Sequence, residues 1–137
     1  MKIDSIKNGI VIDHITAGAG MQLYNMLGLD RLDCSVAIIK NAPSGKMGKK
    51  DIIKIDSSID INLDIISFIS PNATVNIIEN EICVEKRKIE LPDRLVNIIK
   101  CKNPRCITTI EQEIQHEFIL TDRIKGEYRC VYCDAKA

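Results

Sequence analysis

The sequence contains no tryptophan and few other aromatic residues, with two phenylalanines and three tyrosines among 137 residues. Its core must therefore come mainly from isoleucine, valine and leucine, and the β-branched members of that set favour strands. The formal net charge is zero, because 19 basic residues balance 19 acidic ones. A protein that coats nucleic acid is normally basic. This balance therefore argues against that class, and we expect no nucleic-acid partner.

Long hydrophobic runs are also absent. No apolar stretch reaches the roughly 18 residues needed to cross a bilayer, and the N-terminal sequence MKIDSIKNG lacks the apolar region of a signal peptide. We therefore expect a cytoplasmic protein with no membrane partner. Thiols stay reduced in that compartment, so paired cysteines predict metal ligands rather than disulfides.

The first two thirds of the chain alternate β-branched runs with segments of helical periodicity. The order β-α-β-β-α-β with one added strand predicts an α+β fold, a ferredoxin-like antiparallel sheet with both helices on one face. Asn80 and Glu81 are expected at the turn between the last two strands. Strands are expected at 8–15, 35–41, 51–56, 73–80 and 81–86, and helices at 16–30 and 57–70, with Thr16 and Ser57 or Ser58 as N-caps.

A domain boundary is expected near Pro92, where hydrophobic periodicity gives way to cysteine spacing. This predicts one domain at 1–92 and a second at 93–137. The second is close to the size at which an apolar core alone no longer suffices and a metal ion usually helps. We therefore expect a small all-β domain that binds zinc.

Four of the six cysteines form two close pairs, Cys101-x4-Cys106 and Cys130-x2-Cys133. Each short loop lets two thiolates converge on one ion, and four thiolates bind Zn²⁺ tetrahedrally. Four sulfur ligands leave no open position for water, so the zinc, one per chain, is expected to be structural rather than catalytic.

Three further residues invite a chemical role but are expected to be ordinary. His116 lies between the cysteine pairs, yet four sulfurs already complete the coordination shell, so we expect an exposed histidine. Cys34 and Cys83 stand alone in predicted strands and are expected to be small core or half-buried apolar residues.

The remaining candidates are polar residues in apolar strands. The segment VIDHI places Asp13 beside His14, and strand alternation would point them to opposite faces, which argues against a catalytic dyad. Lys54 interrupts a strand and Lys86 lies near the end of another. If His14, Lys54 and Lys86 converged on one edge of the sheet, they would form an anion site. The alternative is two water-facing lysines and a core or edge histidine. The loop SGKMGKK at 44–50 does not match a phosphate-binding loop and is expected to be a solvated turn.

Several segments together resemble a known family. They are GIVIDHI (9–15), PSGKMGKKDIIKID (43–56), PNATVNIIEN (71–80), LPDRLVNI (91–98) and the four-cysteine set. In this order and spacing, the chain resembles the regulatory chain of aspartate carbamoyltransferase over nearly its whole length.

The resemblance implies a non-catalytic, allosteric subunit in pyrimidine biosynthesis. Its N-terminal domain would bind CTP as inhibitor and ATP as activator, and would pair with a second copy to form a homodimer. Its zinc domain would dock on the catalytic chain, so that regulatory dimers bridge catalytic trimers.

The resemblance also assigns nucleotide-binding residues by position. His14 and Lys86 would contact the triphosphate, whereas Asp13 and Lys54 would lie on the ribose and base side. The pocket would be lined by Ile6, Val11, Asn76, Ile78 and Cys83.

Two other functions fit part of the sequence. A zinc-ribbon nucleic-acid-binding protein would explain the four cysteines, but it would not explain VIDHI or Lys54. A small metalloenzyme is disfavoured because the predicted metal site is closed.

Overall fold

The computed structural model describes residues 6–137. The chain divides into two compact units, with the division between Ile89 and Glu90. The first unit contains a five-stranded sheet and two α-helices, and the second contains a three-stranded sheet and one helical turn. Each unit is described by itself below.

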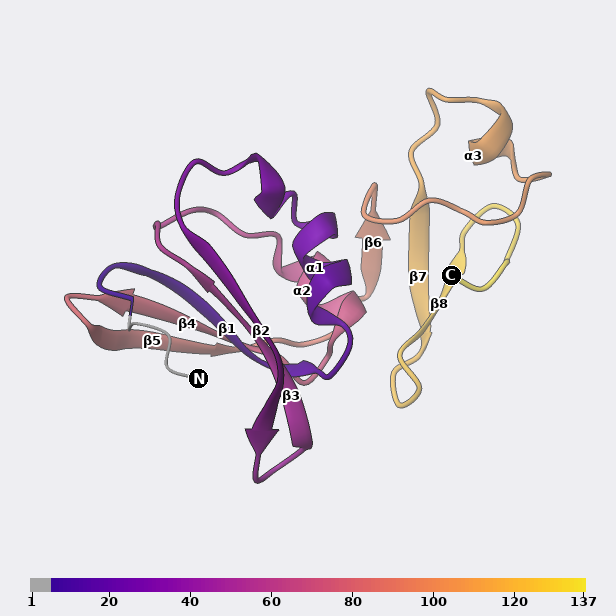
Figure 1. The fold of residues 1–137 in the computed structure, drawn as a ribbon. Coiled ribbons are helices and arrows are strands. Elements are labelled where there is room, and N and C mark those ends of the chain that lie inside the picture. The colour runs from indigo at the N-terminus through magenta and orange to yellow at the C-terminus, as the bar shows by residue number, and fades with distance from the viewer. Residues whose placement is uncertain (1–5) are drawn as a thin grey trace. The chain divides into compact units, whose positions relative to one another are not determined.

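The sheet of the first unit is antiparallel throughout, and its spatial order is β2-β3-β1-β4-β5 (Figure 1). This is the ferredoxin-like order with one strand added beyond β4, as the sequence predicts. The strands are β1 (Gly9–Thr16), β2 (Val36–Ser44), β3 (Gly48–Ile55), β4 (Thr74–Glu79) and β5 (Ile82–Lys88).

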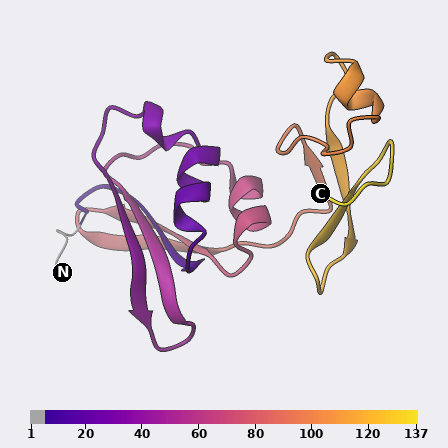
Figure 2. The ribbon, with the colours of Figure 1, turned by 45° about the vertical axis from the view of Figure 1, so that its right-hand side comes forward.

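Both helices pack on one face of this sheet (Figure 2). They are α1 (Gly20–Met26), followed by the 3-10 turn η1 (Leu29–Arg31), and α2 (Leu63–Ile69). The predicted N-caps are wrong. Thr16 is the last residue of β1, and α2 begins after Asn62, whose side chain accepts a hydrogen bond from the Asp64 backbone N at 3.0 Å.

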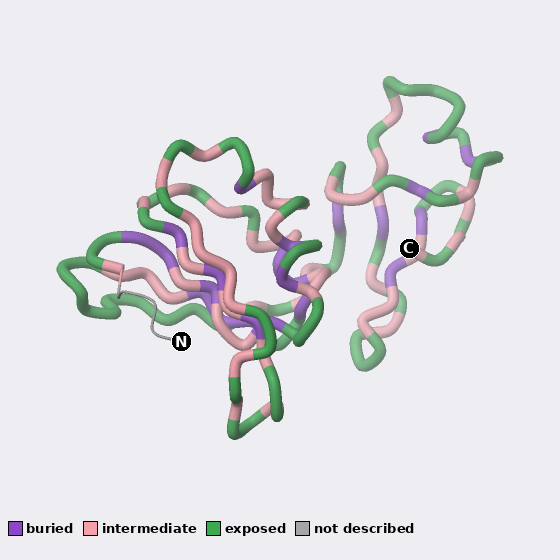
Figure 3. The backbone as a smooth tube through the Cα atoms, viewed as in Figure 1, coloured by how far each residue is buried: buried purple, intermediate pink, exposed green. Residues whose placement is uncertain are grey.

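The core of the first unit lies between the helices and the sheet. Alternate residues of the three central strands point to the helices and are buried, as the tube in Figure 3 shows. They pack against buried Leu23 of α1 and Ile66 of α2. The strand residues in this cluster are Ile10, Ile12, Ile15, Ile53, Ile55 and Val75. Isoleucine thus provides most of the core in a chain without tryptophan.

Two hairpins differ in how well the sequence predicts them. The turn between β4 and β5 lies at Asn80 and Glu81, as expected, and both residues have positive φ (51° and 67°). The segment 44–50, expected to be a loop, instead belongs largely to the β2–β3 hairpin, since β3 already begins at Gly48. Gly48 has a φ of 76°, which suits the tight turn that joins the two strands.

A buried carboxylate, that of Asp51 on β3, ties three segments of the first unit together. Its side chain is fully buried. Asp51 Oδ2 accepts hydrogen bonds from the backbone N atoms of Gly18 (3.0 Å) and Gly20 (2.9 Å), and Oδ1 accepts one from Asn41 (2.9 Å). The carboxylate therefore fixes the turn after β1, the start of α1 and the irregular part of β2.

The second unit is built on the antiparallel sheet β6-β7-β8. Its elements are β6 (Arg94–Val96), the single helical turn α3 (Ile107–Ile110), β7 (Glu117–Asp122) and β8 (Glu127–Cys130). Leu95, Phe118 and Tyr128 are buried on one face of this sheet. The Tyr128 hydroxyl donates to the Pro92 carbonyl oxygen at 2.6 Å, which fixes the chain just before β6.

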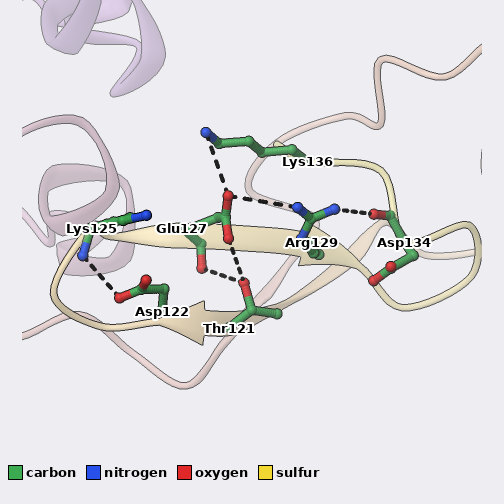
Figure 4. A network of polar contacts seen from close by, with 7 residues as sticks. All are labelled: Thr121, Asp122, Lys125, Glu127, Arg129, Asp134 and Lys136. Carbon is green, nitrogen blue, oxygen red and sulfur yellow. Dashed lines mark hydrogen bonds and ion pairs between the residues drawn. The ribbon is translucent and has the colours of Figure 1, made fainter.

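The edge strand β8 carries a polar network on its exposed side (Figure 4). One carboxylate oxygen of Glu127 pairs with Lys136 Nζ at 3.5 Å and Arg129 Nη2 at 3.7 Å. Arg129 also donates to the Asp134 carbonyl oxygen at 2.9 Å. Glu127 thereby ties β8 to the C-terminal residues that follow the last cysteine.

Candidate functional site

The open face of the first sheet, the face that carries no helix of this unit, collects polar residues in cross-strand rows. Val11 lies opposite Lys54 on one side and opposite Asn76 on the other, and Asn76 lies opposite Lys86. Directly opposed residues point to the same face of a sheet. Four predicted nucleotide-binding residues on four neighbouring strands therefore share the open face.

A second row lies next to the first. Asp13 is opposite Thr74, and Thr74 is opposite Lys88. Lys50 Nζ contacts Asp13 Oδ1 at 2.9 Å, and both side chains are largely buried. On the other side of the first row, Ile78 lies opposite Cys83 after a register shift between β4 and β5.

His14 occupies an irregularity at the end of β1. Its φ is 57°, and the pairing of β1 with β3 shifts between Ile12 and Ile15. The expected alternation of Asp13 and His14 therefore does not hold. His14 Nδ1 lies 3.2 Å from Thr74 Oγ1, and Thr74 is the residue opposite Asp13. The irregularity brings the imidazole to the residues of the second row.

A cavity of about 590 Å³ opens at this end of the sheet. Two predicted residues, His14 and Lys86, line it together with two lysines that sequence reasoning missed, Lys46 and Lys88. Its other lining residues are Met47, Pro71, Asn72, Ala73, Thr74 and Ile89. Among the described residues, no carboxylate lines the cavity, so its basic groups favour an anion.

The other predicted nucleotide-binding residues are not in the cavity lining. Val11, Lys54 and Asn76 lie on the same sheet face, in the first row. Ile6 is half-buried near Gly9 at the start of β1. Cys83 is exposed on β5, which contradicts the expectation of a core or half-buried thiol. Its strand is the edge of the sheet, where no further strand or helix of the unit covers it. Cys34 is half-buried, as expected.

Asp13 is held in its charged form. Burial raises the pKa of its carboxyl, but the hydrogen bonds from Lys50 and from the His14 backbone N outweigh burial, so that the pKa lies below its ordinary value. A carboxylate beside this basic region provides an acceptor for hydroxyl or amino groups.

The second candidate site is the cysteine cluster of the second unit. The Sγ atoms of Cys101, Cys106, Cys130 and Cys133 all lie within 4.8 Å of one another. Cys101 Sγ and Cys133 Sγ are 3.6 Å apart, and Cys106 Sγ and Cys130 Sγ are 3.7 Å apart. Cys106 immediately precedes α3 and Cys130 ends β8, so the helical turn and the hairpin place the two pairs.

The donor set fits a metal ion that prefers sulfur. Burial raises the pKa of Cys101 to about 12, whereas the hydrogen bond with the Thr108 hydroxyl lowers the pKa of Cys106 to about 6. A bound cation would lower the pKa of every cysteine in the cluster, because it stabilises all four thiolates together. Four convergent thiolates are the ligand set of a closed, structural zinc site.

His116 departs from the sequence expectation. It is half-buried rather than exposed, and its ring Nδ1 accepts a hydrogen bond from the Cys101 backbone N at 3.2 Å. Its own backbone N donates to Asn97 Oδ1 at 3.1 Å. His116 therefore supports the first cysteine loop from outside the four-sulfur cluster.

Comparison with known proteins identifies the family of both units. A family model described as aspartate carbamoyltransferase regulatory chain, allosteric domain, matches residues 1–90, and one described as the metal binding domain of the same chain matches residues 93–137. The chain belongs to the aspartate carbamoyltransferase regulatory chain family. The resemblance seen in the sequence is thereby confirmed.

Curated relatives named aspartate carbamoyltransferase regulatory chain span nearly the whole chain. The protein of Clostridium botulinum strain Hall is 56% identical over 134 residues, covering 98% of this chain and 92% of the relative. That of Clostridium acetobutylicum is 52% identical over 134 residues with the same coverage. That of Bifidobacterium longum is 43% identical over 137 residues, covering 100% of this chain and 99% of the relative.

As an aspartate carbamoyltransferase regulatory chain, the protein is a non-catalytic subunit with an allosteric domain and a metal-binding domain. Cys101, Cys106, Cys130 and Cys133 are the residues that would hold one structural zinc ion in the metal-binding domain. No helix of the described residues is long and apolar enough to cross a membrane.

Proposed function

We propose that this regulatory chain binds CTP as an inhibitor and ATP as an activator on the open face of its first unit. His14 and Lys86 would contact the triphosphate, and Asp13 and Lys54 would lie on the ribose and base side. The pocket would be completed by Ile6, Val11, Asn76, Ile78 and Cys83.

The convergence of cationic side chains on the open face carries this proposal. His14 and Lys86 line one cavity with Lys46 and Lys88, and Lys54 stands in the same cross-strand row as Lys86. A triphosphate carries several negative charges and requires several cations or N–H donors. A chain of zero net charge that brings Lys46, Lys86 and Lys88 to one cavity supports binding of a polyanion rather than of an uncharged metabolite.

The arrangement also supports selection of a nucleoside. Asp13, already charged through Lys50, can accept hydrogen bonds from ribose hydroxyls. Val11 and Ile78 offer apolar surface to a base. The side-chain amide of Asn76 offers that base both a hydrogen-bond donor and an acceptor. Phosphate, sugar and base would thus meet different chemistry on one continuous face.

We further propose that residues 1–92 form the nucleotide-binding domain and pair with a second copy, and that residues 93–137 dock on the catalytic chain. The regulatory dimers would then bridge catalytic trimers in the cytoplasmic synthesis of pyrimidines. Exposed apolar side chains next to the cysteine cluster support docking. Ile110 on α3 is 64% exposed, and Tyr132 between the last two cysteines is 50% exposed.

A nucleotide on the first unit can change activity elsewhere only if it binds two states of the whole assembly with unequal affinity. The proposal therefore separates two roles. The open face of the first unit would sense the effector, and the metal-binding unit would maintain contact with the catalytic chain.

Calorimetric titration of the zinc-loaded chain with CTP and with ATP tests the effector site. We expect saturable binding of each nucleotide, and Lys86→Ala should weaken it by about 10-fold or more because a charge-assisted bond to phosphate is lost. Lys125→Ala is the matched control, since Lys125 is an exposed lysine of the other unit. No binding by the unmodified chain, or equal loss in both variants, would refute the effector site.

Assembly with the catalytic chain tests the separation of roles. Lys86→Ala should form the complex as tightly as the unmodified chain, measured by analytical ultracentrifugation at matched concentrations. If the same substitution loosened the complex as much as it weakened CTP binding, effector sensing and assembly would share one surface and the proposed division would be wrong.

A further inference from the structure

One sulfur of the cysteine cluster has a polar partner outside the cluster. Cys106 Sγ lies 3.0 Å from the side-chain hydroxyl oxygen of Thr108. Both residues are buried, with 1% of Cys106 and 2% of Thr108 exposed. The contact is therefore shielded from water, where a single hydrogen bond has its greatest effect.

The direction of this hydrogen bond follows from chemistry. A thiolate that binds a metal has no proton and can only accept, so the Thr108 hydroxyl donates to Cys106 Sγ. The neighbouring residue behaves differently. The Thr109 hydroxyl donates to the Asn103 carbonyl oxygen at 2.8 Å and lies at the surface. Of these two adjacent threonines in α3, only Thr108 contacts a sulfur.

The position of Thr108 is set by the helical turn that follows Cys106. Cys106 is the N-cap of α3, with φ −68° and ψ 142°, and Thr108 is the second residue of the turn. This geometry turns the threonine side chain back toward the cap residue. A valine of the same shape would fit the same space without a donor.

We propose that Thr108 is a positioning residue of the metal site, whose hydroxyl orients the Cys106 thiolate and moderates its charge. A hydrogen bond to a coordinating thiolate withdraws electron density from sulfur and restricts the rotation of the side chain. The fixed orientation and the reduced repulsion among four neighbouring thiolates outweigh the weaker donation, so the cluster would bind a metal more tightly with this hydroxyl than without it.

Metal affinity of the full-length chain tests the inference. Zinc would be competed away with a chromogenic chelator, and the apparent dissociation constant compared between variants. Thr108→Val should weaken zinc binding by about 10-fold or more, the usual effect of removing a partner of a metal ligand. Thr108→Ser, which keeps the hydroxyl, should retain the affinity within about threefold. Thr121→Val is the control, because Thr121 is an exposed threonine of the same unit whose hydroxyl donates to the Glu127 carbonyl oxygen, away from the cysteine cluster. Its affinity should also stay within about threefold.

Cobalt(II) substitution provides a readout that a purely structural role would not change. Loss of the hydrogen bond makes sulfur a stronger electron donor, so the sulfur-to-cobalt charge-transfer band of Thr108→Val should shift to longer wavelength. The bands of Thr108→Ser and Thr121→Val should match the unmodified chain. If Thr108→Val does not fold, Thr108→Ser and Thr108→Ala can be compared instead. These two variants differ by one hydroxyl, so their zinc affinities and cobalt spectra test the same hydrogen bond.

Three results would overturn the inference. Thr108→Val could bind zinc as tightly as the unmodified chain, with an unchanged cobalt spectrum. Thr121→Val could lose as much affinity as Thr108→Val. Thr108→Ser could fail to restore binding. The first result would show that the hydroxyl is irrelevant, and the other two would show that the loss of affinity does not come from the sulfur contact.

Discussion

The two units of this regulatory chain are stabilised in different ways. The first buries ten apolar residues in one cluster that joins the sheet to both helices. Among the described residues of the second, Leu95, Phe118 and Tyr128 are the buried large apolar side chains, and three of the four clustered cysteines are buried beside them. The first unit has a core that is separate from its candidate binding site, whereas in the second the candidate binding site is much of the core.

This difference predicts how each unit responds when its ligand is lost. On the first sheet, the core residues and the proposed effector residues lie on opposite faces, so the open face can be empty or occupied without a change in the core. The second unit has too few apolar contacts to fold from burial alone. The effector should therefore be optional for folding, and the metal should be obligatory.

Metal removal should produce the largest effect. Stripping the ion with a mercurial or a strong chelator should unfold residues 90–137 and leave the first unit folded, because zinc–thiolate binding supplies on the order of 10 kcal/mol in small zinc domains. Two-dimensional amide NMR would follow both units in one sample. Signals from β6, β7 and β8 should collapse to unfolded positions while those of β1 to β5 stay dispersed, and the catalytic chain should be released.

The matched control is the titration of zinc back into the stripped chain, which should restore the second set of signals with one equivalent. Persistence of dispersed β7 and β8 signals after complete metal loss would show that the small apolar core suffices. The contrast between the two units would then be wrong.

Within the first unit, Asp51→Asn should produce the next largest effect. The amide keeps one oxygen, but its NH₂ group must face backbone N–H groups that the carboxylate now accepts from. If the amide oxygen keeps the bonds from Gly18 and Gly20, the bond from Asn41 is lost and two donors face each other in the interior, which should cost about 3 kcal/mol of unfolding free energy. Denaturant titration, read from the β1 and β3 amide signals, would measure it.

Asp60→Asn is the control for this substitution, because Asp60 is an exposed aspartate of the same unit. It should change the unfolding free energy by no more than about 0.5 kcal/mol. A similar small loss for Asp51→Asn would mean that the buried carboxylate is not what joins α1 to the sheet.

Much of the fold could be predicted from the sequence because the strands carry strong local signals. Ile53 and Ile55 alternate with the polar residues Lys54 and Asp56, and the order of helices and strands then leaves few topologies. Helix starts were less predictable. Serines and a threonine were equally suitable caps, yet tertiary packing placed the start of α2 at Asn62. The two cysteine pairs predicted the metal cluster because short loops alone bring their sulfurs together.

The effector face could be predicted only in part. Lys54 and Lys86 interrupt or end apolar strands, and this signal is visible in the sequence. Lys46 lies in a hairpin turn, and its approach to the cavity depends on how that hairpin packs. The position of His14 depends on a left-handed residue within β1, which no local pattern around VIDHI indicates. Thr108 likewise becomes significant only once α3 is known to turn it toward Cys106.

The smallest predicted effect is a loss of stability of the first unit at low pH, through the carboxyl of Asp13. The pKa of Asp13 lies below its ordinary value of 3.8 because hydrogen bonds from Lys50 and His14 outweigh the effect of burial. A carboxyl whose pKa is lowered by folding stabilises the folded state above the pKa of the unfolded chain. That stability is lost as the pH falls through the lower, folded pKa. The first unit should therefore lose unfolding free energy as the pH drops below 3.8, by less than metal removal or Asp51→Asn costs.

Comparison of the unmodified chain with Asp13→Asn isolates this contribution. The amide cannot titrate, so the difference in unfolding free energy between the two proteins should be constant above about pH 5 and should shrink as the pH falls below 3.8. Glu127→Gln is the control, because it removes an ion-paired carboxylate from the second unit. It should leave the unfolding free energy of the first unit at low pH unchanged. A difference that stayed constant to pH 2 would show that Lys50 contributes nothing to stability through Asp13. The ion pair would then matter only for holding Asp13 ready for a ligand.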